Sequence, residues 1–244
     1  MGERRVTSIG RHVGLDDVGP DARARLDALA RIVQDVSDFD ASSAPIDGMG
    51  LWILRRMAID IAFTPRFRAE VTARTWCSGV GARWAERTTH LYVGDRLCAE
   101  AVAIWVYVDR AGRPARLGEW FFEHYGGAAD GRKVSSRLSL PHPPAGAHVR
   151  PWPVRASDFD LLRHVNNAAY WYAVEDELAR LAPGRAPVSA ELEHRAAIEP
   201  GDPVELRSTV DDDDVLWVWL TARGETRSAA QVRLGAPGKR HAPR

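Results

Sequence analysis

The feature that most constrains the fold is an order of predicted elements that occurs twice along the chain. In the first half, a strand at residues 6–13 precedes a helix whose apolar stripe is spaced by three, four and three residues, namely Leu26, Leu29, Val33 and Val36. Four stretches of alternating or continuous apolar residues follow as strands, at residues 57–63, 71–76, 83–93 and 97–108. Gly94-Asp95 predicts a hairpin between the last two.

The second half repeats this order. A strand near residues 149–156 precedes a helix that starts at Asn167, ends at Pro183-Gly184 and carries its apolar stripe at Tyr170, Val174, Leu178 and Leu181. Four strands follow, at residues 190–198, 204–210, 215–222 and 228–234. An internal duplication of about 100 residues is the simplest explanation of this order.

A single helix followed by antiparallel strands buries its apolar stripe only if the sheet curves around it. Two such sheets can protect their exposed edges by pairing edge to edge. The sequence therefore predicts an α+β tandem (double) hotdog, in which each half is a curved antiparallel sheet wrapped around one long helix. We place the N-terminal hotdog at 1–127, a Gly-, Ser- and Pro-rich linker at 128–147 and the C-terminal hotdog at 148–244. Residues 37–50 are predicted to form a polar loop, and the tail at 239–244 to be disordered.

The composition limits the classes of function. The 244 residues contain 33 Lys and Arg against 33 Asp and Glu, so the net charge gives no reason to expect a nucleic-acid partner. No apolar run has signal-peptide or membrane-spanning length, so we expect a cytoplasmic protein without a membrane partner. Cys77 and Cys98 lie in predicted strands and suit buried, reduced thiols. Because neither a Cys/His cluster nor a Gly-rich phosphate loop is present, we expect no metal and no nucleotide cofactor.

Several chemically useful side chains gather where the second predicted helix begins. Asp160, His164, Asn166 and Asn167 precede or open this helix, whose first N–H groups have no partner within the helix. Such a helix start can polarise a carbonyl oxygen while a carboxylate or an imidazole acts beside it. The alternative interpretation is an Asx-rich helix cap with a surface histidine.

The residues in this stretch resemble a known signature. The run Asp158-x-Asp160-x-x-x-His164-Val165-Asn166-Asn167-x-x-Tyr170 is similar to that of the acyl-acyl carrier protein thioesterases, the two-hotdog family of plants and bacteria. The first half also resembles the N-terminal pattern of that family, through Trp52-x-x-x-Arg56, Pro65, Val71, Thr75-Trp76-x-Ser78-Gly79 and Trp105-Val106-x-x-Asp109.

The resemblance implies a thiolester hydrolase that releases free fatty acid from the phosphopantetheine arm of acyl carrier protein in fatty acid biosynthesis. It also implies that the N-terminal hotdog holds much of the acyl chain and that the C-terminal hotdog carries the catalytic residues. In the family pattern the site reads Asp-x-Asn-x-His, with an acid and often a cysteine on a later strand. Asp160 and His164 match that pattern, whereas Leu162, Ala197 and Ile198 occupy the asparagine, acid and cysteine positions.

These departures leave Asp160 and His164 as the core of any mechanism. Asp160 could be the general base for water or a carboxylate nucleophile, and His164 could orient it, share its proton or be the base. Backbone N–H groups at the start of the helix that begins at Asn167 could contact the oxyanion. One residue among Glu191, Glu193 and Glu199 could replace the missing acid, although a solvated strand face is the alternative interpretation.

For substrate binding we select Trp52, Trp76, Leu162 and Tyr170, while large aromatic residues in strands also serve as core. Arg132, Lys133 and Arg137 could receive an acidic carrier protein, or belong to an ordinary solvated linker. Two other functions stay open: hydrolysis of acyl-CoA, because the thioester chemistry is the same, and catalytically weak acyl binding, because the asparagine and the acid are missing. A homodimer is compatible with these expectations.

Overall fold

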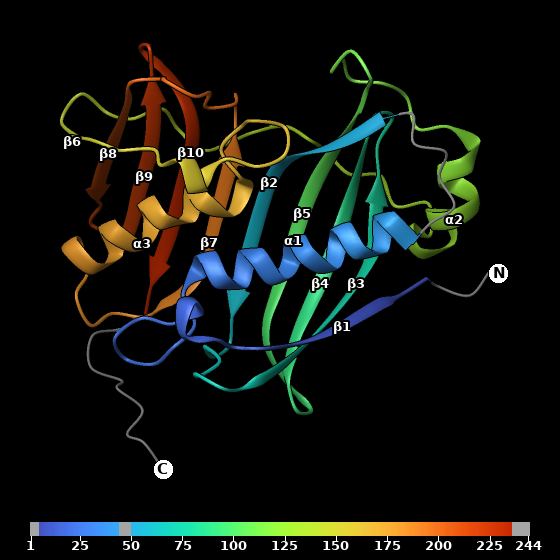
Figure 1. The fold of residues 1–244 in the computed structure, drawn as a ribbon, viewed down its shortest axis with the longest axis horizontal. Coiled ribbons are helices and arrows are strands. Elements are labelled where there is room, and N and C mark those ends of the chain that lie inside the picture. Colours follow the sequence, from blue (N-terminus) through green and yellow to red (C-terminus); the bar gives the residue numbers. More distant parts are fainter. Residues whose placement is uncertain (1–4, 44–49, 236–244) are drawn as a thin grey trace. The chain divides into compact units, whose positions relative to one another are not determined.

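The computed structural model describes residues 5–43 and 50–235, and it divides into two compact units, Met1–Ser139 and Leu140–Arg244. In each unit an antiparallel sheet packs against one long helix (Figure 1). This confirms the predicted fold class. The predicted domain bounds of 1–127 and 148–244 enclose all strands of the sheets, and we keep them as a proposal. None of the helices in the described ranges is long and apolar enough to cross a membrane.

In the first unit, β1 (Thr7–His12) and a 3-10 turn, η1 (Leu15–Asp17), precede the long helix α1 (Leu26–Ser43). The remaining strands are β2 (Gly50–Ile61), β3 (Glu70–Val80), β4 (Trp84–Val93) and β5 (Arg96–Asp109), followed by α2 (Glu119–Ala129). The strand order is β1-β3-β4-β5-β2. The four residues of the predicted apolar stripe of α1 are buried, so burial of this stripe drives the packing of the helix against the sheet.

The second unit follows the same path. It contains β6 (His148–Pro151), the 3-10 turns η2 (Ala156–Asp158) and η3 (Asn167–Ala169), the helix α3 (Tyr170–Leu181), and β7 (Pro187–His194), β8 (Val204–Val210), β9 (Val215–Ala222) and β10 (Glu225–Leu234). Its strand order, β6-β8-β9-β10-β7, is the order of the first unit with each strand replaced by its counterpart. The predicted duplication is therefore visible in the topology. β6 is shorter than predicted, because the chain turns at Arg155 into η2.

The polar loop predicted at residues 37–50 is wrong in its first part, because α1 continues to Ser43. Asp40 is buried in this last part of the helix and forms ion pairs with Arg5 at 3.0 Å and Arg87 at 2.7 Å. These partners lie far away in the sequence, so the local pattern gave no sign of them. Residues 44–49 and the predicted disordered tail lie outside the described residues.

Helix α2 was not predicted, and its last residues belong to the stretch that we interpreted as linker. Gly126 and Gly127 each disfavour a helix by about 1 kcal/mol relative to alanine. The opposing contribution is aromatic burial: Phe121 and Tyr125 pack in a cluster with Trp52 and Tyr107, and each aromatic residue buries a large apolar area. Tertiary packing therefore outweighs local propensity here.

The segment after α2 is extended, as a linker should be, and it covers part of each sheet. In the first unit it runs beside the end of β3, where Val80 donates to Arg132 O at 2.9 Å and Val134 donates to Val80 O at 3.1 Å. In the second unit Leu140 and Ala147 are buried with Trp219, whose indole N–H donates to Pro141 O at 2.8 Å. The segment therefore covers part of the sheet in each unit.

We predict that Glu177 anchors α3 to its sheet. Its fully buried carboxylate pairs with Arg150 at 2.9 Å and accepts the Ser208 hydroxyl at 2.6 Å. Removing one member of a buried ion pair costs about 3–5 kcal/mol, so Glu177→Gln should lower the free energy of unfolding by about that amount in urea titrations. The matched control is Asp176→Asn, an exposed neighbour 3.4 Å from the same arginine, which should change stability by roughly 0–1 kcal/mol. Equal losses in the two variants would contradict the anchor.

The ion pair between Glu177 and Arg150 also makes the stability of the protein depend on pH. Burial raises the pKa of Glu177, but the hydrogen bonds from Arg180, Ser208 and Arg150 outweigh it and the pKa is lowered overall. A lowered pKa in the folded state contributes stability above the unfolded pKa of about 4.3 and loses it as the pH falls through the folded value. The stability difference between wild type and Glu177→Gln should therefore shrink below about pH 4.

Candidate active site

The candidate site is a tight loop, residues 155–166, which we call the site loop. At its start the Asp158 carboxylate accepts the Arg155 N–H at 2.8 Å. At its end the Asn166 N–H donates to Asp158 O at 2.7 Å, and the Val165 N–H donates to Ile198 O at 3.2 Å. These bonds fix both ends of the loop and tie it to the segment after β7.

Asp160 lies inside this loop and is half-buried. Its Oδ1 accepts the Leu162 N–H at 2.8 Å and, more weakly, the His164 N–H at 3.4 Å. Its own N–H donates to His164 O at 2.9 Å. Asp160 Oδ2 accepts no hydrogen bond from any described residue, so this carboxylate oxygen is available for chemistry while Oδ1 holds the side chain in place.

His164 faces Asp160 across the turn, and its side chain is exposed. Its imidazole forms no hydrogen bond or ion pair with any described residue. The backbone therefore brings Asp160 and His164 together, as the sequence predicted, without joining their side chains by a hydrogen bond.

The two asparagines have different surroundings. Asn166 caps the helix start, because its Oδ1 accepts the Ala168 N–H at 2.9 Å. The cap occupies one of the N–H groups that we expected to be free for an oxyanion. Asn167 opens η3 and is half-buried, and its N–H has no acceptor among the described residues. Of these two N–H groups at the helix start, the one of Asn167 is therefore the donor that remains available to an oxyanion.

Tyr170 is the buried member of the site. Burial raises the pKa of its hydroxyl to about 12, and the negative charge of Asp160 acts in the same direction. The hydroxyl oxygen accepts the Ile198 N–H at 3.3 Å, and the ring packs edge-on against His194 with centroids 4.8 Å apart. At neutral pH Tyr170 is therefore a protonated hydroxyl that can still donate its own hydrogen.

The acid and cysteine positions of the family pattern do not supply side-chain chemistry. Ala197 is exposed, and Ile198 acts through its backbone, which bonds both Val165 and Tyr170. His194 packs on Tyr170, and alternate strand residues point to opposite faces, so Glu193 and Glu191 point to the other face of the sheet. Neither can replace the missing acid.

Our expectation of a solvated strand face is wrong for Glu193. It is fully buried, pairs with Arg195 at 3.3 Å and accepts the Leu140 N–H at 3.1 Å. The extended segment that covers this face explains the burial. Glu199, the third candidate, is exposed and directly follows Ile198.

The predicted substrate-binding residues do not all share one surface. Trp52 belongs to the aromatic cluster that includes Cys77, whereas Trp76 precedes Cys77 on β3 and therefore points to the opposite face, where it packs edge-on against His90. A single acyl chain on one face of this sheet can contact only one of these two tryptophans. Leu162 lies on the site loop and is 46% exposed.

The first unit contains a second copy of the site loop, at residues 14–25, which we call the copy loop. The hydrogen bonds that close the site loop have counterparts here. The Gly14 N–H donates to Asp17 Oδ2 at 2.8 Å, as Arg155 does to Asp158, and the Gly19 N–H donates to Arg23 O at 2.9 Å, as Asp160 does to His164. The Arg25 N–H donates to Asp17 O at 2.9 Å and the Ala24 N–H to Pro65 O at 2.8 Å, which correspond to the bonds of Asn166 and Val165. Ala22 has φ 60° where Arg163 has φ 61°. Gly19 and Arg23 stand in place of Asp160 and His164. The copy loop therefore has the same backbone conformation but neither the carboxylate nor the imidazole.

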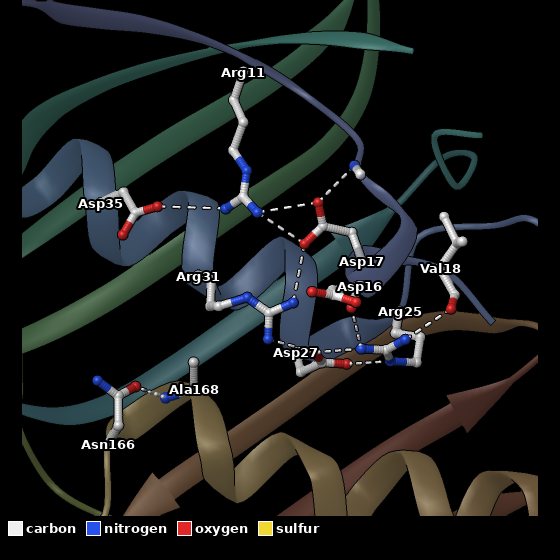
Figure 2. Close-up of polar contacts among 11 residues, drawn as sticks. Arg11, Asp16, Asp17, Val18, Arg25, Asp27, Arg31, Asp35, Asn166 and Ala168 are labelled. Carbon is white, nitrogen blue, oxygen red and sulfur yellow. Dashed lines mark hydrogen bonds and ion pairs between the residues drawn. The ribbon is translucent and has the colours of Figure 1, made fainter. Parts of the chain in front are cut away.

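Ion pairs between arginine and aspartate side chains brace the copy loop (Figure 2). Arg11 and Arg31 both contact the Asp17 carboxylate, at 2.8 Å and 3.0 Å. Arg25 donates to Val18 O at 2.7 Å and pairs with the buried Asp27 at 2.8 Å. In the described chain, no ion pair involves the charged residues of the site loop. The candidate site is therefore held without ion pairs, by hydrogen bonds between backbone groups and by backbone N–H groups that donate to the Asp158, Asp160 and Asn166 side chains.

Comparison with known proteins identifies the family. The sequence pattern of the acyl-ACP thioesterase N-terminal domain matches residues 10–123, and that of the C-terminal domain matches residues 142–234. The chain belongs to the acyl-ACP thioesterase family. As a member of this family it is a thioester hydrolase acting on fatty acyl thioesters, as the site-loop residues predicted.

Relatives of this acyl-ACP thioesterase family member span nearly its whole length. Two uncharacterised proteins of Mycobacterium tuberculosis, from strains CDC 1551 / Oshkosh and ATCC 25618 / H37Rv, are each 28% identical over 232 residues, which is 93% of this chain and 92% of theirs. The fold is shared with solved structures of low identity. The 12:0-ACP thioesterase of Umbellularia californica has a TM-score of 0.81 and 16% identity, over 96% of this chain and 99% of its own.

Two bacterial structures agree with this likeness of fold. A protein of Lactobacillus plantarum described as an oleoyl thioesterase has a TM-score of 0.83 at 19% identity, over 97% of this chain and 98% of its own. An acyl-ACP thioesterase of Bacteroides thetaiotaomicron has a TM-score of 0.81 at 18% identity, over 94% and 98% of the two chains. Among the described residues of this thioesterase, no group of three or more His, Cys, Asp or Glu is placed to hold a metal ion.

We predict that the Tyr170 hydroxyl supports the site loop through Ile198. Tyr170→Phe leaves the buried Ile198 N–H without its acceptor, and an unsatisfied buried donor costs about 1–3 kcal/mol. Thermal or urea unfolding should show a loss of that size. Tyr107→Phe is the control, because the Tyr107 ring is also buried but its hydroxyl has no hydrogen bond to a described residue. A Tyr170→Phe protein as stable as Tyr107→Phe would contradict the prediction.

Proposed function

We propose that this chain hydrolyses acyl-acyl carrier protein and thereby releases free fatty acid in fatty acid biosynthesis. The observation that carries the proposal is the Asp160 carboxylate, which lies on the loop that carries the family signature, accepts hydrogen bonds at Oδ1 and accepts none from a described residue at Oδ2. The N-terminal hotdog is proposed to hold the acyl chain, and the cytoplasm is the proposed compartment. A homodimer stays a prediction.

In the proposed reaction, Asp160 Oδ2 takes a proton from a water molecule as the water oxygen attacks the thioester carbonyl carbon. The carbon–sulfur bond then breaks, the carboxylic acid forms, and the proton passes from Asp160 to the departing thiolate. Direct attack by Asp160 is the alternative route, with an acyl-enzyme anhydride that water hydrolyses. The exposed His164 has the freedom to turn toward Asp160 and orient it or share its proton.

The developing oxyanion needs a hydrogen-bond donor. The Asn167 N–H has no acceptor among the described residues and lies at the positive end of α3, which makes it our first choice. Such a donor lowers the barrier by roughly 3–4 kcal/mol. The family's asparagine and acid are replaced in this chain, so the proposed site depends on one carboxylate, one imidazole and one backbone donor.

Acyl-CoA is the second candidate substrate, and catalytically weak acyl binding is the third. A turnover panel of acyl carrier protein and CoA thioesters of several chain lengths separates the three. A higher kcat/KM for carrier-protein thioesters supports the proposal, and a higher kcat/KM for CoA thioesters favours the second candidate. Binding without hydrolysis of any thioester above the buffer rate would establish the third.

We expect Asp160→Asn to lower kcat by about 10²–10⁴-fold with little change in KM, because general-base participation contributes roughly that factor. His164→Ala should cost less if the imidazole only orients the carboxylate. The control is Asp21→Asn in the copy loop, whose carboxylate accepts the Arg23 N–H at 3.1 Å in a similar turn, and it should leave kcat unchanged. An Asp160→Asn enzyme with full kcat would overturn the assignment of this residue.

Leu162→Asn tests whether the replaced asparagine matters. Leu162 contributes its backbone N–H to Asp160 Oδ1, and any residue at 162 keeps that bond. Because the leucine side chain is 46% exposed, it contributes little burial to the carboxylate. We therefore expect Leu162→Asn to keep or raise kcat at neutral pH. A slower variant whose pH–rate profile moves to lower pH would show instead that the leucine desolvates Asp160.

A further inference from the structure

The tip of the site loop exposes apolar surface that the architecture of the loop does not require. Leu161 is 102% exposed and Leu162 is 46% exposed. A leucine that projects entirely into water gains nothing from burial in the folded protein. The adjacent Arg163 is exposed too, as is Arg155 at the start of the loop. Neither guanidinium forms a hydrogen bond or an ion pair with another described residue.

The copy loop serves as an internal control for this tip. It has the same backbone bonds and the same positive φ, with Pro20, Asp21 and Ala22 in place of Leu161, Leu162 and Arg163. Because the turn forms with both sets of residues, folding does not dictate two leucines and an arginine. These three residues are present on the loop that carries Asp160 and absent from the loop that lacks it. We therefore relate them to binding at the candidate site and not to the folding of the turn.

We infer that Leu161, Arg163 and Arg155 form a docking surface for the acidic carrier protein that delivers the thioester. This inference rests on the proposed function, and it names the surface that holds the protein part of the substrate. The carrier-protein surface suggested by the linker is weaker, because Arg132 is engaged by the Glu86 carboxylate and the Ser78 carbonyl oxygen.

The exposed leucine and arginines at the tip of the site loop fit a thioester that is attached to a protein better than one that is attached to a nucleotide. An acidic protein with an apolar spot can cover a leucine and pair with the two flanking guanidinium groups at the same time. A nucleotide handle would use the arginines but would leave Leu161 in water. Arginines at the rim of a protein–protein interface speed up and orient association with an acidic surface. Their effect weakens as the salt concentration rises.

The test transplants residues between the two loops. The double variant Leu161→Pro and Arg163→Ala gives the site loop the residues that the same turn holds in the copy loop, so the turn should still form. Affinity for holo acyl carrier protein is measured by fluorescence anisotropy. Turnover is measured with one acyl group on the carrier protein and on N-acetylcysteamine, a small thioester without a protein handle.

We expect the double variant to weaken binding of the carrier protein, and to raise KM for its thioester, by roughly tenfold or more. The kcat/KM for the N-acetylcysteamine thioester should stay unchanged. Arg155→Ala should give a smaller loss, and the loss should fade at high salt. The reverse transplant, Pro20→Leu with Ala22→Arg in the copy loop, is the matched control and should leave affinity unchanged.

Several results would overturn the docking surface. One is an unchanged affinity for the carrier protein in the double variant. Another is an equal loss with the small thioester, which would place these residues at the acyl group or the thioester. A third is unchanged carrier binding together with lost binding to phosphatidylglycerol vesicles, which would identify a lipid partner. If the wild type hydrolyses no thioester, the proposed function fails, while the anisotropy measurement still decides on the surface.

Discussion

The candidate site depends on the hydrogen bond between the Asp158 carboxylate and the Arg155 N–H, because this bond starts the turn that places every other group. Asn166 closes the turn on Asp158 O, and α3 begins immediately afterwards. Asp160 and His164 face each other only because this turn is closed. The buried aspartate of the motif is thus an architectural residue, and the half-buried one two positions later is the residue that we propose as the base.

The duplicated fold separates architecture from chemistry within one chain. Asp17 repeats the role of Asp158 at the same distance of 2.8 Å, so that role is needed in both units. Gly19 and Arg23 show that the turn also forms without an aspartate and a histidine at these two positions. The copy loop has instead acquired the bracing by Arg11, Arg25 and Arg31, which suits a loop that only has to hold α1 in place.

The sequence predicted those parts of the structure that local patterns determine. Strands β8 and β9 have the predicted bounds. The apolar stripe of α1 is buried, and that of α3 is buried except at its last residue, Leu181, which is half-buried. The missed parts depend on distant partners: Asp40 extends α1 because Arg5 and Arg87 reach it, and α2 forms because Trp52 and Tyr107 cover its aromatic residues. Glu193 is buried by a segment that joins the two units, which strand parity alone could not show.

In the site itself, the motif selected Asp160 and His164 as candidates, and their catalytic role stays a proposal; their hydrogen bonds could not be predicted from the motif. The asparagine of the family pattern was expected to matter, yet the Asp160 turn uses the N–H of residue 162, and a leucine supplies it equally well. The cysteine position likewise acts here through the backbone of Ile198, which connects Tyr170 to the site loop. Backbone N–H groups therefore hold the Asp160 carboxylate in this chain. They remain in place at positions 162 and 198, where the side chains differ from the family pattern. What such a site loses is a side-chain amide and a second acid, so the proposed mechanism has to rest on Asp160, His164 and the Asn167 N–H.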